Sequence, residues 1–412
     1  MTSAVAPAST DPAHVGHRRL RNRWEQRVLA AASVAVFALA PVEGLLLWLQ
    51  PDAAKLPAAV LGLCWVVLRW RVPPAPRPHA VHVLLAILVV VVSASAATHL
   101  TSPFAVLYTG RWLPFLILTA ILVDLASSLV SVRLLAASAV VGAAVASAGA
   151  LYGVIAFHES RSALPQTDPN DLACALVAAL PLVLCLSPRR LVAKAGVVAA
   201  FTVIALAVVA TQSRGGLLAL AAAAAWLLAR RAVPLRPALS AVGVLGVLGV
   251  ICAYVMRSEI ADALAAKVYI SQRNTDTRLM RWHGAAEMFG GHPFLGVGPG
   301  GFRTGYPAVS GMAEIDIPAQ QFVTHNMYLE VAAELGLLGL VAMLAVLATA
   351  FACAETALRH GIDRRVAIGV QASLIGVAVA EVFLSGEYFF ALWSVVALGC
   401  ALGIRARYGE RI

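Results

Sequence analysis

Long uninterrupted apolar segments constrain this chain more than any other feature of its sequence. The apolar residues come in blocks of about 18 to 25, the length that crosses the hydrocarbon layer of a membrane as a helix. In lipid every backbone N–H and C=O group must be paired within the protein, and blocks rich in Ala, Leu and Val favour helices over barrel strands. Hydrophobic residues make up 60% of the 412 and charged residues only 13%, too few for a soluble exterior. The sequence therefore predicts an all-α polytopic membrane protein.

The apolar blocks predict about twelve transmembrane helices. We expect them at 28–49, 57–70, 80–98, 112–131, 134–156, 170–187, 191–211, 214–229, 237–256, 326–353, 366–384 and 388–404. A polar, arginine-rich tail over 1–27, expected to be disordered, precedes a bundle of nine spans over 28–256. One long loop with short helices, 257–325, separates this bundle from three further spans over 326–404 and a short tail over 405–412.

The distribution of positive charge predicts the orientation of these spans. Most of the 31 Lys and Arg residues fall on alternate connections, the side that faces the cytoplasm in bacterial inner-membrane proteins. Both termini are therefore expected in the cytoplasm, and the loop 257–325 on the extracytoplasmic side. Acidic and basic residues balance within this loop, so the formal charge of +10 does not indicate a nucleic-acid partner.

Several chemical classes are disfavoured by what the sequence lacks. All six cysteines fall inside predicted spans, which argues against a disulfide framework or a cysteine-based metal site. No Walker loop, Rossmann fingerprint or zinc-spaced His/Cys set is present, which argues against an ATP-driven or nicotinamide-dependent protein. We expect neither a cofactor nor a metal ion.

A first candidate site opens the predicted span 214–229. Arg214 follows Ser213 and precedes Gly215 at a helix N-terminus that is expected on the outer face. Free backbone N–H groups, the positive end of the helix dipole and a guanidinium converge there, a combination that binds phosphate or diphosphate. The alternative is a juxtamembrane arginine at a glycine turn, but its position opposes the charge distribution seen elsewhere.

A second candidate site lies where the long loop re-enters the membrane. His325 and Asn326 stand at another outer helix N-terminus, and Glu334 follows about two turns further in. A histidine at this boundary can exchange a proton near neutral pH. The alternative is a polar boundary residue without a chemical role.

A third candidate site is the pair Arg278 and Arg281, next to Trp282 at the start of a predicted loop helix. The planar guanidinium group clamps phosphate oxygens bidentately. The alternative is a solvated loop charge paired with Asp276.

Acidic residues are weaker candidates. Asp171 follows Asp168 at the start of the sixth span, where helix capping explains most of the pattern and substrate binding is the alternative. Glu381 is a functional candidate because ionisable groups inside a membrane are costly. Asp124 and Glu43 are expected to be isolated intramembrane carboxylates.

These sites, in this order, resemble those of the O-antigen ligase and polymerase superfamily of membrane glycosyltransferases. The resemblance covers about 130 residues and rests on three segments: Ser213 to Gly216; Thr277 to Trp282 followed by His292 to Gly298; and His325 to Leu329 followed by Glu334 to Leu340.

The resemblance implies a GT-C-like helical bundle that moves a glycan from a polyprenyl (undecaprenyl) diphosphate donor to an acceptor hydroxyl at the outer face. It implies an inverting, metal-independent reaction. Arg214 and Arg278 match the diphosphate-binding arginines of the superfamily, and His325 matches its loop histidine. We expect substrate-binding roles for Ser213, Gly215, Arg281, Asn326, Glu334 and Asp171.

Three alternatives to a ligase stay open at this point. A repeat-unit polymerase would use the same donor with another lipid-linked repeat as acceptor, whereas the acceptor of a ligase would be a lipid core, a protein or a wall polymer. A secondary transporter or flippase would also have about twelve spans, but transporters place ionisable groups at mid-membrane. A non-catalytic scaffold is the third alternative.

Overall fold

The computed structural model describes residues 23–50, 52–71, 79–186, 188–233, 276–310 and 322–408. Helices account for most of these residues, and none of them forms a strand, which confirms the all-helical prediction. Most of the predicted tail 1–27, the predicted span 237–256, and parts of the loop 257–325 and of the tail 405–412 lie outside the described residues.

The described chain is a succession of helices joined by short connections. Up to residue 185 they are α1 (Arg23–Leu39), η2 (Ala40–Val42), α2 (Glu43–Leu49), η3 (Ala53–Lys55), α3 (Leu56–Arg71), α4 (Ala80–Thr98), α5 (Ala105–Ser128), α6 (Val132–Phe157), α7 (Pro169–Ala179) and η4 (Leu180–Cys185). They continue with α8 (Leu191–Ala210), α9 (Arg214–Ala229), a helix over 276–291, α12 (Gly301–Val309), α13 (Met327–Arg359), α14 (Arg364–Ala380) and α15 (Phe390–Tyr408).

Eight helical segments in these ranges are long and apolar enough to cross a membrane, as expected for a polytopic membrane protein. They are Trp24–Leu49, Ala53–Trp70, Ala80–Thr98, Ala105–Ser128, Val132–Phe157, Leu191–Ala210, Met327–Arg359 and Phe390–Tyr408. The apolar helices Pro169–Cys185 and Arg214–Ala229 are shorter, as is α14 with 17 residues. Every predicted span except 237–256 thus corresponds to an observed helix or helix pair.

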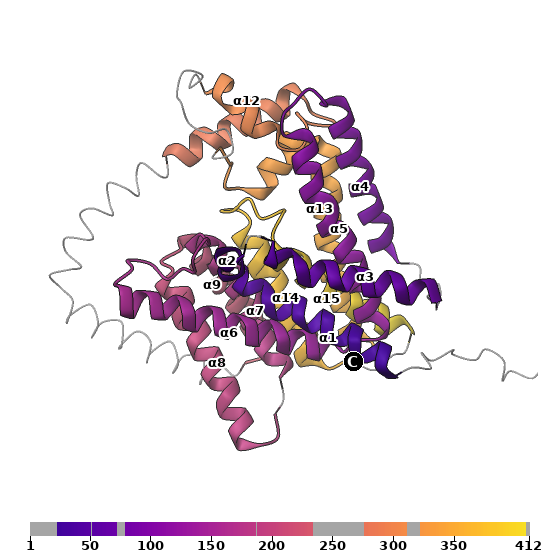
Figure 1. Ribbon diagram of the computed structural model, residues 1–412, viewed down its shortest axis with the longest axis vertical. Coiled ribbons are helices and arrows are strands. Elements are labelled where there is room, and N and C mark those ends of the chain that lie inside the picture. The colour runs from indigo at the N-terminus through magenta and orange to yellow at the C-terminus, as the bar shows by residue number, and fades with distance from the viewer. Residues whose placement is uncertain are drawn as a thin grey trace, which may run out of the picture.

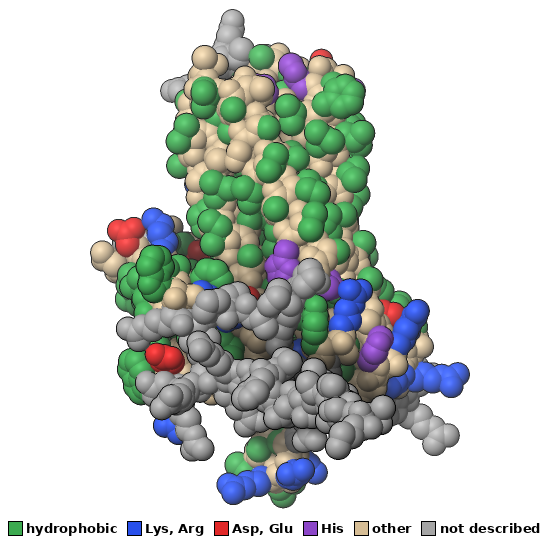
Figure 2. Space-filling model, turned by 90° about the vertical axis from the view of Figure 1, so that its right-hand side faces the viewer, with side chains coloured by type: hydrophobic (Ala, Val, Ile, Leu, Met, Phe, Trp, Pro, Cys, Tyr) green, Lys and Arg blue, Asp and Glu red, His purple; other side chains and the backbone are tan. Residues whose placement is uncertain are grey.

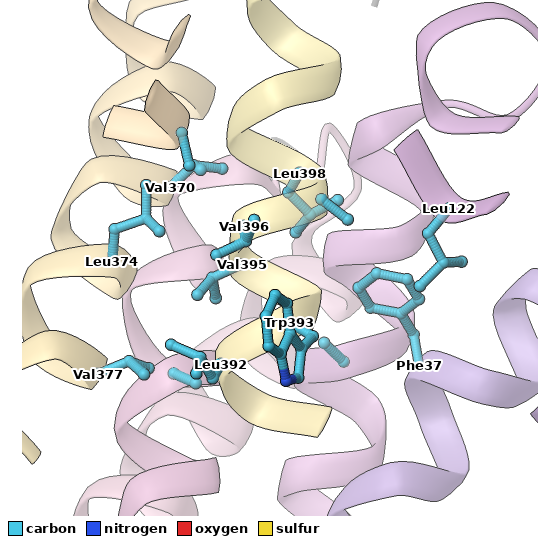
Figure 3. Packing of buried hydrophobic residues seen from close by; sticks show 14 of the residues in the cluster. Phe37, Leu122, Val370, Leu374, Val377, Leu392, Trp393, Val395, Val396 and Leu398 are labelled. Carbon is cyan, nitrogen blue, oxygen red and sulfur yellow. The ribbon is translucent and has the colours of Figure 1, made fainter. Parts of the chain in front are cut away.

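The helices form a tall molecule, and one face of its upper column is largely apolar. In Figure 1, α4, α5 and α13 stand together, with α12 at their top and the helices of a lower bundle beneath. Figure 2 shows hydrophobic side chains over the upper column of one face, whereas Lys and Arg gather lower on that face. Figure 3 shows α15 in the core, with Leu392 near Val377 of α14 and Trp393 on the side of Phe37 of α1. Every residue of α15 from Leu392 to Arg405 is buried.

Asp124 has partners on α3 and is not an isolated carboxylate. It accepts hydrogen bonds from Trp65 Nε1 at 2.7 Å and from Arg69 Nε at 2.8 Å. Trp65 and Arg69 are four residues apart on α3 and therefore share a face of that helix. The prediction of an isolated carboxylate is wrong at this position, because the ion pair with Arg69 accounts for Asp124 structurally.

Helix α13 is broken at Gly336, which has φ of 66° and ψ of −165°. The loop after the 276–291 helix fills the break. Its carbonyl at Pro293 accepts from Leu337 N–H at 2.7 Å, and its N–H groups at Val297 and Gly298 donate to the carbonyls of Ala333 and Glu334 at 2.9 and 3.0 Å. The loop thereby satisfies backbone groups that lose their helical partners at the break.

Replacing Gly336 with Ala is expected to destabilise the protein strongly. The φ and ψ of Gly336 lie in a region that is essentially restricted to glycine, and holding another residue there costs about 1–3 kcal/mol. In addition, an added Cβ would lie 2.3 Å from the Phe294 carbonyl. Gly361→Ala is the matched control, because Gly361 also has positive φ (76°) but nothing within 4 Å of the added Cβ. Thermal unfolding in detergent measures both variants. Equal losses of Tm would show that the loop does not hold the break.

Candidate functional site

The first candidate segment forms the start of α9. Ser213 is its N-cap, and its hydroxyl accepts from Gly216 N–H at 3.1 Å. Gly215 packs against Phe383, since a Cβ at Gly215 would lie 2.8 Å from the Phe383 side chain. Arg214 is exposed between them and makes no hydrogen bond or ion pair with another described residue. The helix N-terminus therefore presents a free guanidinium beside unpaired backbone N–H groups.

Arg278 reaches the same place from the helix over 276–291. Its Nη1 donates to the carbonyl of Phe383 at 3.4 Å, and its side chain is half-buried. Phe383 belongs to the connection between α14 and α15, so that one residue contacts both Gly215 and Arg278. The two arginines predicted to bind diphosphate are thus carried by elements that meet at Phe383.

His325 lies in the loop that enters α13. It has φ of 52°, a left-handed conformation that is uncommon for residues other than glycine. Its backbone N–H donates to Ser385 Oγ at 3.2 Å, two residues beyond Phe383. The imidazole itself makes no hydrogen bond with another described residue, so it is available to a substrate.

The helix over 276–291 supports this loop from the other side. Arg281 Nη1 donates to the carbonyl of Val323 at 3.1 Å, and Trp282 Nε1 donates to the carbonyl of Thr324 at 3.0 Å. Below them, a small apolar core joins this helix to α12, the loop and α13; it consists of Ala285, Met288, Phe302, Tyr306, Phe322 and Ala333. Arg281 therefore binds the loop through a hydrogen bond and also contributes a positive charge beside it.

The surroundings of His325 are predominantly positive. Burial and the charges of Arg278 and Arg281 lower the pKa of His325 to about 4, against smaller opposing effects of Glu330 and Asp168. The imidazole is therefore neutral at pH 7. Arg278 also interacts with Asp168 and with Arg161, whose Nε donates to the Thr211 carbonyl at 2.7 Å before α9. The cationic groups thus outnumber the acidic ones on this side of the loop.

A buried ion cluster lies behind the loop. Arg303 of α12 donates from Nη1 to Glu330 at 2.6 Å and to Glu334 at 3.2 Å, and all three side chains are at most 4% exposed. Glu334 also accepts from Gly300 N–H at 2.8 Å, and the guanidinium lies 4.3 Å from the ring centre of Tyr108. Removing one member of such a buried pair typically costs about 3–5 kcal/mol.

The other predicted binding residues have structural contacts of their own. Asn326 is the N-cap of α13, and its side-chain oxygen accepts from Leu329 N–H at 3.1 Å. Glu334 accepts hydrogen bonds from Arg303 and from Gly300 N–H. Asp171 lies half-buried in the first turn of α7, where it interacts electrostatically with Asp168 and Glu43. Their substrate-binding roles stay predictions.

Two parts of the site were not identified from the sequence. The segment Phe383 to Ser385 is one, because nothing in its composition marks it. The other is Arg303, which was counted among the balanced loop charges. Glu330 and Glu334 lie four residues apart on one face of a predicted span, and two such carboxylates require a cation. The spacing of Glu330 and Glu334 was therefore the feature of the sequence that could have indicated a buried cation such as Arg303.

The arrangement offers groups that suit anionic ligands and proton transfer. Arg214 and Arg278 supply fork-shaped donors for phosphate oxygens, and the neutral His325 supplies a proton acceptor. No group of three His, Cys, Asp or Glu side chains among the described residues is placed to hold a metal ion.

Comparison with protein families supports the same interpretation. Residues 198–344 match the family model described as O-antigen ligase, a segment that contains α9, the 276–291 helix, α12 and the start of α13. A search of curated proteins finds no match. The matched segment carries Arg214, Arg278, Arg303 and His325, but ends before Phe383 and Ser385. The match covers less than half of the chain, and residues 198–344 are thereby similar to the O-antigen ligase family, whose members are glycosyltransferase-like ligases or polymerases.

Proposed function

We propose that this protein transfers a glycan from a polyprenyl diphosphate to an acceptor hydroxyl at the outer face of the bacterial inner membrane. The observation that carries the proposal is the convergence of three elements on one segment. The N-terminus of α9 and Arg278 contact Phe383, and the loop of His325 is bound to Ser385. The excess of Lys and Arg on alternate connections supports a cytoplasmic location for both termini.

The arginines are assigned to the donor. In glycosyl transfer from a lipid diphosphate, the diphosphate is the leaving group and gains negative charge as the sugar bond breaks. Arg214 and Arg278, with the N–H groups at the start of α9, stabilise that charge in the transition state. Arg281 adds to the positive field, and no metal ion is required for this role.

His325 is assigned to the acceptor. Its neutral imidazole accepts the proton of the attacking hydroxyl while the oxygen forms the new bond to the anomeric carbon. Attack from the side opposite the departing diphosphate inverts the configuration at that carbon. Burial is the largest cause of the lowered pKa of His325, and the charges of Arg278 and Arg281 lower it further. A bound diphosphate offsets these charges and so raises the pKa of His325. The base therefore becomes stronger only in the loaded enzyme.

Replacing Arg281 with Gln is expected to move the pH dependence of the reaction. Loss of this positive charge raises the pKa of His325 from about 4 towards its ordinary 6.5. Because the imidazole acts as a base only above its pKa, the acid limb of the kcat/KM profile shifts to higher pH. Arg281→Lys is the control, since it retains the charge. A limb that stays in place, or moves down, in Arg281→Gln would contradict the electrostatic assignment.

Analysis of polyprenyl-linked glycans tests the function itself. Cells without the protein are compared with the same cells that express either the wild type or His325→Ala. Long lipid-linked chains accumulating without active protein indicate a ligase, and single repeat units indicate a polymerase. If the lipid-linked pool is unchanged in both deficient strains, the enzyme proposal fails and a transporter or flippase becomes the better explanation.

A further inference from the structure

The carboxylate of Glu330 is buried and fully used within the protein. Its side chain is 1% exposed, and Oε1 accepts from Arg303 Nη1 at 2.6 Å. Oε2 accepts from Thr324 N–H at 3.2 Å and lies 2.9 Å from the Thr324 hydroxyl. Since both oxygens are occupied and out of reach of solvent, Glu330 does not contact a substrate.

Ser385 connects this carboxylate to the loop of His325. Its hydroxyl donates to Glu330 Oε2 in a short hydrogen bond, which leaves its lone pairs free for the backbone N–H of His325. Thr324 and His325 are therefore both tied to one carboxylate oxygen, the first directly and the second through Ser385. Arg303 offsets the negative charge and anchors it to α12.

The conformation of His325 explains why such a connection is needed. A non-glycine residue with φ of 52° is strained unless the surrounding structure holds it. The side of the loop that faces the 276–291 helix is held by Arg281 and Trp282 through the carbonyls of Val323 and Thr324. The N–H groups of Thr324 and His325 are held by Glu330 and Ser385. Donors and acceptors of the loop backbone are thus fixed from two sides.

We infer that Glu330, acting through Ser385, is a positioning residue that fixes the imidazole of His325 for proton transfer. This inference rests on the function proposed above. The reacting groups remain His325 and the two substrates, and Glu330 and Ser385 act only by holding the loop. A catalytic group displaced by about 1 Å can lose about 100-fold in rate.

Ser385→Ala tests the connection without breaking the buried ion cluster. Turnover is expected to fall about 10- to 100-fold, while KM for the lipid donor and the Tm stay near the wild-type values. Ser385→Thr, which retains a hydroxyl, is expected to recover turnover. Ser394→Ala is the matched control, because Ser394 is largely buried and, within the described part of the chain, its hydroxyl donates only to the Ala391 carbonyl of α15.

A second measurement reports on the loop without any transfer reaction. Diethyl pyrocarbonate modifies neutral imidazole, and mass spectrometry gives its rate at His325. This rate is expected to increase several-fold in Ser385→Ala and in Glu330→Gln, but not in Ser394→Ala. If the wild-type protein transfers no glycan but the labelling rate of His325 still increases in Ser385→Ala, the proposed function is wrong. The role of Glu330 and Ser385 in holding the loop of His325 is then still supported.

Two results would overturn the inference. One is wild-type turnover and wild-type labelling in Ser385→Ala. The other is a loss of turnover that only parallels a loss of Tm in Ser385→Ala, with no recovery in Ser385→Thr, because that pattern describes a structural residue.

Discussion

Replacing His325 with Ala is expected to slow glycan transfer about 10²–10⁴-fold. Under the proposed mechanism, the variant lacks the imidazole that takes the proton of the acceptor hydroxyl. The fold is expected to survive, because the loop is bound to Ser385 through the backbone N–H of His325 and not through its side chain. The measurement is the initial rate of transfer by purified protein in lipid nanodiscs, with lipid-linked donor and acceptor supplied.

His292→Ala is the matched control for this experiment. His292 follows the helix over 276–291, is exposed, and contacts His99 with ring centres 6.4 Å apart. It should retain wild-type activity. A His325→Ala protein that is folded and transfers glycan within about twofold of wild type would remove histidine from the mechanism, since general base catalysis contributes far more than that.

Replacing Arg278 with Ala is expected to lower turnover about 10²–10³-fold, the typical loss on removing one group that stabilises transition-state charge. Arg214→Ala is expected to behave similarly. Arg278→Lys should recover only part of the rate, because an ammonium retains the charge but not the bidentate geometry. Turnover and KM for the donor are measured separately, and the loss is expected mainly in turnover.

Arg190→Ala is the control for the arginine variants. Arg190 is also an exposed arginine at a helix N-terminus, but it precedes α8 and therefore lies at the opposite end of the α8–α9 pair from Arg214. Its removal should leave transfer unchanged. Equal losses from Arg190→Ala and Arg214→Ala would show that the effect is general electrostatics and not donor binding.

The local parts of this structure were predictable from the sequence. Ser213 and Asn326 begin helices because their side chains satisfy N–H groups a few residues away, and such capping depends on adjacent sequence alone. The long apolar helices were also predictable, because each corresponds to one continuous apolar block of the sequence. The three candidate segments were therefore identified correctly as helix starts and loop arginines.

The long-range parts were not predictable. Phe383 is an ordinary apolar residue in the sequence, and its importance comes from folding against Gly215 and Arg278, which are far away along the chain. Arg303 became a partner of Glu330 only because α12 packs against α13. The break at Gly336 depends on a loop that precedes it by about 40 residues, so no local pattern marks it.

The break in α13 also affects how this protein fits a bilayer. As one straight rod, its 33 residues would extend about 50 Å, well beyond a hydrocarbon layer of about 30 Å. The part from Gly336 to Arg359 measures about 36 Å and is sufficient to span that layer alone. The short part from Met327 to Gly336, with the histidine loop attached, is then not needed to cross that layer. Spanning the bilayer therefore sets a length requirement for the part of α13 after the break and none for the part that carries the histidine loop.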